Sequence, residues 1–208
     1  MHIASQLTAK LVNSHICADT ISMQQTNLTN QFLIAMPSLR DPNFERTVTY
    51  ICAHNEEGAM GIVINKPLDI ELSEIFEQMK LPLDNPEACS KKIFQGGPVH
   101  TNHGFILHDT SHQWESSITV SEDICVTTSR DILEAMAKGS GPKKSLVALG
   151  YAGWAGGQLE QEILDNAWLS GPADRDIIFN TPSEQCWLLA ADHMGVDIDK
   201  LSSDIGHA

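Results

Sequence analysis

The sequence predicts an α+β fold, a single compact domain in which a mixed β-sheet curls over a few packed helices. Short apolar runs rich in β-branched and aromatic residues come in consecutive groups, and helix-period segments lie between the groups. No internal repeat or low-complexity linker divides the 208 residues, a length that suffices for one sizeable core. A doubly wound sheet would instead show strands and helices alternating one by one.

The first group of strands is expected at residues 31–36, 47–54 and 60–65, each bounded by turn-forming residues. A helix should follow, because Leu72, Ile75, Phe76 and Met79 share the i, i+3, i+4, i+7 spacing of one apolar face. The proline-bearing segment 80–92 is interpreted as a loop.

A second group of strands and a second helix come next. Thr128 and Asp131 have the spacing of a capping box, which predicts a helix that begins there and ends at Gly139. The strands of this group are expected at residues 104–108, 117–120 and 124–128.

The last third of the chain should supply the central strand and the longest helix. Residues 145–154 are the most apolar run, which is typical of a central strand. The last helix has a clear start, with Thr181 as N-cap, Pro182 at its first position and Glu184 at capping-box spacing. Its buried stripe is predicted to consist of Trp187, Leu188, Ala191 and Met194.

Residues 1–26 are predicted to be a poorly ordered extension, because they show no capping signal, no clear period and no signal-peptide pattern. The domain proper is assigned to residues 27–208. No apolar run approaches the ~20 residues of a membrane span, so no membrane association is expected.

The charge balance disfavours nucleic acid as a partner. Thirteen Lys and Arg oppose 27 Asp and Glu, a net charge of −14, whereas nucleic-acid affinity rests on basic side chains that displace counterions. The basic residues cluster only as two pairs, Lys91-Lys92 and Lys143-Lys144, which are interpreted as solvated loop charges. Five widely spaced cysteines without a C-x-x-C pair indicate buried free thiols in a reducing compartment, hence a cytoplasmic protein.

The stretch "GYAGWAGGQLEQEILDN", residues 150–166, raises the question of a phosphate-binding loop. Its glycines do not match G-x-G-x-x-G, and no Gly-Lys-Ser/Thr follows. Glu160 and Glu162 lie at the start of the helix, where they repel phosphate. The glycines are therefore predicted to serve tight turns and close packing, and no nucleotide or other cofactor is expected.

A polar and aromatic cleft is a candidate ligand-binding site, if the turn at 94–99 meets the stretch at 150–158. Purely structural turns are the alternative, because Gly-Pro pairs mark turns first. The candidate residues are Asn65, Gln95, Gly96, Gly97, Tyr151, Trp154 and Gln158.

Neither a metal site nor a nucleophile is predicted. His100, His103, His108 and His112 lie on or beside an expected strand, and His103 and His108 would point to opposite faces. No G-x-S-x-G elbow is present, although a triad assembled from distant positions stays open.

Several spaced motifs together resemble the AlgH/YqgE family of small bacterial cytosolic proteins. They include "GAMGIVINKP", "FQGGPV", "ALGYAGWAGGQLEQEILDNAWL" and "FNTP", and the similarity covers about residues 27–208. The resemblance implies a bifurcated sheet folded into a pseudo-barrel. It implies no reaction, cofactor or catalytic residue, and some members are described as transcriptional regulators.

The sequence thus favours a non-catalytic binding or regulatory protein that acts through a protein partner or a small ligand, without direct DNA binding. An enzyme whose substrate cleft is lined by the two glycine-rich turns is the alternative. Convergence of Asn65, Gln95 and Gln158 around one pocket would favour the enzyme.

Overall fold

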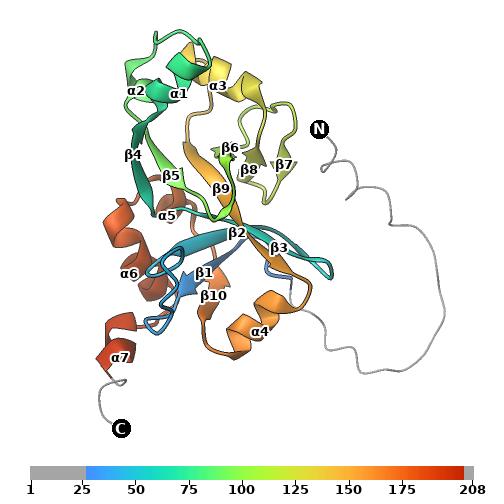
Figure 1. Cartoon of the computed structure of the whole chain (residues 1–208), viewed down its shortest axis with the longest axis vertical. Coiled ribbons are helices and arrows are strands. Elements are labelled where there is room, and N and C mark those ends of the chain that lie inside the picture. The colour runs from blue at the N-terminus through green and yellow to red at the C-terminus, as the bar shows by residue number, and fades with distance from the viewer. Residues whose placement is uncertain (1–26, 204–208) are drawn as a thin grey trace, which may run out of the picture.

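The computed structural model describes residues 27–203 and contains a ten-stranded, curled sheet with helices on its faces (Figure 1). The expected extension at 1–26 lies outside the described residues. The strands are β1 (Gln31–Ala35), β2 (Val48–Asn55), β3 (Gly58–Val63), β4 (Pro67–Glu71), β5 (Lys92–Gln95), β6 (Val99–Asp109), β7 (Ile118–Thr119), β8 (Ile124–Thr127), β9 (Ser145–Ala155) and β10 (Trp168–Pro172). The helices are α1 (Leu72–Gln78), α2 (Pro86–Cys89), α3 (Arg130–Ala137), α4 (Gln158–Leu164), α5 (Arg175–Phe179), α6 (Ser183–His193) and α7 (Ile198–Ser203).

The central strand β9 belongs to both halves of the sheet. Its first half pairs with β6 and, in parallel, with β5, whereas its last residues pair with β3. The β3 side continues through β2 and β1 to β10, and the β6 side continues through β8 to β7. The sheet is therefore mixed and divides along β9, which confirms the predicted α+β class and the bifurcated sheet.

Gly150 is the point at which β9 passes from one half to the other. Its φ is +75°, in the left-handed region, and a Cβ there would lie 2.5 Å from the carbonyl oxygen of Gly97. Before it, the even-numbered Leu146 and Ala148 face the main core; after it, the odd-numbered Tyr151 does. One glycine thus reverses the side-chain alternation of the strand, which only glycine does without a steric penalty.

Three apolar clusters fill the space around the divided sheet. The main cluster lies between the two halves of the sheet and helices α5 and α6. A second lies under α1, α2 and α3, which gather at one end of the molecule (Figure 1). The third holds Trp154, Trp168 and Leu159 of α4 at the other end. Each half of the sheet is therefore covered on its second face by its own helices.

The helices largely follow the predicted signals. In α1, Leu72 and Phe76 are fully buried, and Glu71 and Glu74 close a capping box at its start. Thr127 ends β8, and α3 begins after Ser129 rather than Thr128. The α3 helix ends at Ala137, shortly before Gly139 at φ +76°.

Three predictions about the helices and loops were wrong. Leu188 is 45% exposed, because α6 turns Cys186 and Ala190 inward beside Trp187 and Ala191. Pro182 is the N-cap of α6, and the Thr181 hydroxyl instead donates to the carbonyl of Asp176 in α5. The segment 80–92 is not all loop, since it contains the short helix α2.

Five short elements, β4, β5, β10, α5 and α7, were not predicted. Each has only four to six residues, too few for a period to be visible.

The glycines of the stretch 150–157 are required for different reasons. Gly157 has φ +76° at the start of α4, and a Cβ on Gly156 would lie 2.4 Å from the Glu56 carbonyl oxygen. A Cβ on Gly153 would meet only the Tyr151 ring, at 3.1 Å. A left-handed turn therefore explains the glycine at position 157, and close backbone packing explains the glycine at position 156.

Replacing Gly150 by alanine should destabilise the fold by at least about 1–3 kcal/mol, because the new Cβ would strain the backbone and meet the Gly97 carbonyl. Gly104→Ala is the matched control, since nothing lies within 4 Å of its Cβ position, and it should change stability by less than about 0.5 kcal/mol. Denaturant unfolding of both variants measures the difference. Equal stabilities would contradict the assigned role of Gly150.

Candidate ligand pocket

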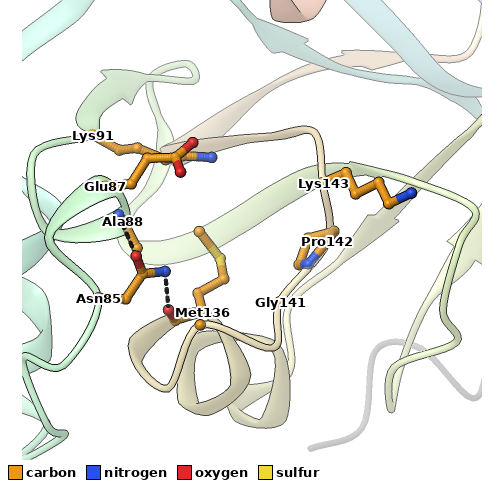
Figure 2. A pocket seen from close by; sticks show the side chains of 9 residues that line it. Asn85, Glu87, Ala88, Lys91, Met136, Gly141, Pro142 and Lys143 are labelled. Carbon is orange, nitrogen blue, oxygen red and sulfur yellow. Dashed lines mark hydrogen bonds between the residues drawn. The ribbon is translucent and has the colours of Figure 1, made fainter.

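A pocket of about 330 Å³ opens between α2, the end of α3 and the loop that leads into β9 (Figure 2). Figure 2 shows Lys91 and Glu87 on one side of the pocket and Pro142 and Lys143 on the other. Its volume falls at the lower end of the range found for small-molecule sites. The lining residues are Asn85, Glu87, Ala88, Lys91, Met136, Gly139, Gly141, Pro142 and Lys143.

The pocket brings together the two lysine pairs that the sequence separates by about 50 residues. Lys91 and Lys92 stand at the start of β5, and Lys143 and Lys144 precede β9. Because β5 and β9 are parallel neighbours, with Ile93 opposite Val147, both strands start at the same edge of the sheet. Lys143 is exposed in a loop, as the interpretation of solvated loop charges expects, whereas Lys91 is half-buried, and both line one pocket.

Lys91 is half-buried, and its Nζ donates to the Ser145 hydroxyl at 3.0 Å. Burial lowers the pKa of Lys91 below its ordinary value, Glu87 acts in the opposite direction, and Lys144 lowers the pKa further. An additional hydrogen-bond acceptor near a half-buried ammonium stabilises its charged form.

The wall of the pocket is held by polar and steric contacts. Asn85 caps α2 by accepting from the Ala88 amide at 3.4 Å, and its side-chain amide donates to the Met136 carbonyl at 3.0 Å. This one side chain joins α2 to the end of α3 (Figure 2). A Cβ on Gly141 would lie 2.6 Å from the Met136 side chain, so the loop approaches α3 as closely as glycine permits.

His108 lies directly across the strand pair from Ser145, the hydrogen-bond partner of Lys91. Its ring is fully buried, and Nδ1 donates to the Asp109 carbonyl at 2.7 Å. Its Nε2 has no hydrogen-bond partner among the described residues. Burial lowers the pKa of His108, while Asp109 and Asp131 act in the opposite direction. His108 is therefore a neutral core residue with one free acceptor nitrogen.

None of the seven residues of the predicted cleft lines this pocket, and several of them contact backbone groups of neighbouring strands. Asn65 accepts from the Val48 amide at 2.8 Å and donates to the Arg46 carbonyl at 2.9 Å, which fixes the start of β2. Cβ positions on Gly96 and Gly97 would meet the backbone of Gly150 and Tyr151 at 2.3 Å and 2.2 Å.

The turn at 94–99 and the strand at 150–151 do meet, which was the condition for the candidate cleft. Gln95 pairs with Leu149 in the sheet, and the Gly96 amide donates to the Leu149 carbonyl at 2.8 Å. Tyr151 stacks on His100 and contacts Phe105 edge to face. Ligand binding by these residues stays a prediction.

Trp154 and Gln158 belong to a different group, centred on Glu162. The indole N–H groups of Trp154 and Trp168 donate to one oxygen of Glu162 at 2.9 Å and 2.8 Å, and Gln158 donates to the other at 2.9 Å. Trp154 is only 6% exposed. The amides of Asn65 and Gln158 are thus committed to separate structural roles and share no hydrogen-bond partner.

The histidines and cysteines form no metal cluster within residues 27–203. His100 and His103 lie in contact on the exposed part of β6, and His108 is buried further along it. His54 accepts from the Leu28 amide and bonds Glu160 at 2.9 Å. Cys52, Cys89, Cys125 and Cys186 carry free thiols.

Among the described helices, none has the length and apolar content that crossing a bilayer requires.

The profile of the AlgH-like family matches residues 32–199 of this chain. The chain belongs to the AlgH-like family. A UPF0301 protein of Thioalkalivibrio sulfidiphilus is 60% identical over 88% of this chain and 98% of its own length. A UPF0301 protein of Hahella chejuensis is 54% identical over 90% of this chain and 100% of its own length. The predicted family resemblance is thereby confirmed.

Two solved structures share the fold of this AlgH-like protein. The solution structure of the AlgH protein from Pseudomonas aeruginosa is 45% identical, with a TM-score of 0.73 over 93% of this chain and 100% of its own. A crystal structure of a Corynebacterium diphtheriae protein is 19% identical, with a TM-score of 0.66 over 84% and 91% of the two chains, and supports the fold alone.

The buried, neutral His108 should make stability pH-dependent. Its folded-state pKa is lowered, so the unfolded chain binds the proton more readily and stability falls as the pH drops below about 6.5. The loss is bounded by about 1.4 kcal/mol per pH unit. His108→Asn keeps a donor for the Asp109 carbonyl and cannot titrate, so its unfolding free energy should change less between pH 7.5 and 5.5. Parallel curves for both proteins would contradict this assignment.

Proposed function

We propose that this AlgH-like protein is a non-catalytic binding protein that takes a small ligand in the α2–α3 pocket. The observation that carries the proposal is a pocket of about 330 Å³ lined by charged and apolar side chains. Its wall is fixed by the Asn85 bridge between α2 and α3, so little ordering would oppose binding.

A regulatory role would follow from this binding without direct contact to DNA. The net charge of −14 opposes a polyphosphate partner, and the helices within residues 27–203 are short and include no basic recognition helix. A change in the α2–α3 pocket on binding would be passed to a protein partner. The four free thiols of the described part of the chain are consistent with a cytoplasmic site of action.

Covering the pocket should abolish ligand binding. Glu87 is exposed in the first turn of α2 and lines the pocket, so Glu87→Trp should obstruct the pocket without disturbing the core. Glu184→Trp is the matched control, an exposed first-turn glutamate on α6. A metabolite library is screened by thermal shift, where saturation near 100 Kd should raise the melting temperature by about 5–10 °C.

A ligand of this pocket should stabilise the wild type and Glu184→Trp but leave the melting temperature of Glu87→Trp unchanged. A ligand that stabilises all three proteins equally would bind elsewhere and contradict the proposed site.

Duplex DNA should show no specific binding at physiological salt, for the electrostatic reason given above. Fluorescence anisotropy with labelled genomic fragments measures this over a series of salt concentrations. Sub-micromolar affinity with a steep salt dependence would overturn the expectation.

A further inference from the structure

We propose that the α2–α3 pocket recognises an anion, a carboxylate or phosphate group bound by the Lys91 ammonium with Lys143 at the opposite wall. This inference rests on the proposed function and adds the chemical class of the ligand. Four observations support it: the unused donors of Lys91, the sign of the local charge, the position of Glu87 and the size of the pocket.

The Lys91 ammonium has unused hydrogen-bond donors. An ammonium carries three N–H donors, and Ser145 Oγ accepts one of them at 3.0 Å. Among residues 27–203, Lys91 forms no ion pair and no second hydrogen bond. Because the side chain is half-buried, water does not fully replace the missing partners, and an anion that enters the pocket would form charge-assisted hydrogen bonds there.

Lysines gather at one edge of the sheet in a chain that is acidic overall. The net charge is −14, yet the edge where β5 and β9 begin carries Lys91, Lys92, Lys143 and Lys144. Lys92 is paired with Glu71, and Lys144 Nζ donates to the Asn180 side chain. Lys143 is exposed, lines the pocket and has no such partner in the described chain. Lys91 and Lys143 are therefore the cations left for a ligand.

Glu87 is the one carboxylate of the lining, and it forms no ion pair with Lys91 within the described residues. It is exposed, and although its charge favours the protonated Lys91, it also opposes an incoming anion. Removing its charge should therefore tighten anion binding, whereas a merely structural role of Lys91 predicts no such effect. The volume of about 330 Å³ accommodates an anion of the size of citrate.

The test uses the full chain labelled with ¹⁵N and followed by amide NMR. Citrate and inorganic phosphate are titrated as separate probes at constant ionic strength, with glycerol as the neutral control. We expect saturable shifts with at least one anion at the amides of Ala88, Lys91, Gly139 and Gly141, and none with glycerol. The two probes distinguish a carboxylate from a phosphate ligand.

Three variants decide the assignment. Lys91→Met keeps the apolar stem and should weaken binding at least about tenfold. Lys92→Met, with the same change in net charge, should bind like the wild type, because Lys92 is paired with Glu71 outside the pocket. Glu87→Gln should bind more tightly. Amide spectra that match the wild type away from the pocket show that each variant is folded.

The affinity should also fall as the pH rises toward the lowered pKa of Lys91, because binding requires the protonated amine. Lys91→Met should lose this pH dependence, and Lys92→Met should keep it.

The inference is overturned if neither anion shifts the pocket amides, or if Lys91→Met binds an anion as tightly as Lys92→Met does. Its failure differs from that of the proposed function. A neutral metabolite that stabilises the wild type but not Glu87→Trp would preserve the pocket as a binding site and refute only the anionic ligand.

Discussion

The structure depends on one constraint, the reversal of side-chain direction at Gly150 in the middle of β9. With φ +75°, this residue lets a single strand pair with β5 and β6 before it and with β3 after it. The carbonyls of Gly97 and Val99 occupy the space that a Cβ would need. Without the reversal, the residues after Gly150 would turn the wrong face to the main core, and the two halves could not share it.

The same strand also determines where charge accumulates. Parallel pairing of β5 with β9 places the starts of both strands at one edge, and lysines precede both. In a chain of net charge −14, this local excess is held by the backbone topology and by the bond from Lys91 to Ser145. Partial burial makes the ammonium of Lys91 costly unless it is paired, which is the physical basis for an anion in the neighbouring pocket.

Many polar residues that attract attention in the sequence are instead used to satisfy buried donors. Glu162 accepts from two indole N–H groups that would otherwise be buried without a partner. Glu160 bonds His54, and Asn65 holds the start of β2. The acidic start of α4 therefore satisfies donors around the third cluster, and its repulsion of phosphate stays a prediction.

The sequence alone determined the fold class, the family, most strands and the periodic helices, because apolar period and capping residues are local properties. The exposed first half of β6, from Val99, was not predicted, because it has no apolar run. The sequence left open whether the turn at 94–99 meets residues 150–151, and the parallel pairing of β5 with β9 brings them together. It could not reveal that Leu188 faces solvent, since α6 has apolar residues on both faces and only the docking of Trp187 and Ala190 fixes its rotation. Nor could it show that Lys91 and Lys143 share a pocket. That depends on a parallel strand pairing between segments about 50 residues apart, and no local signal encodes which distant strands become neighbours.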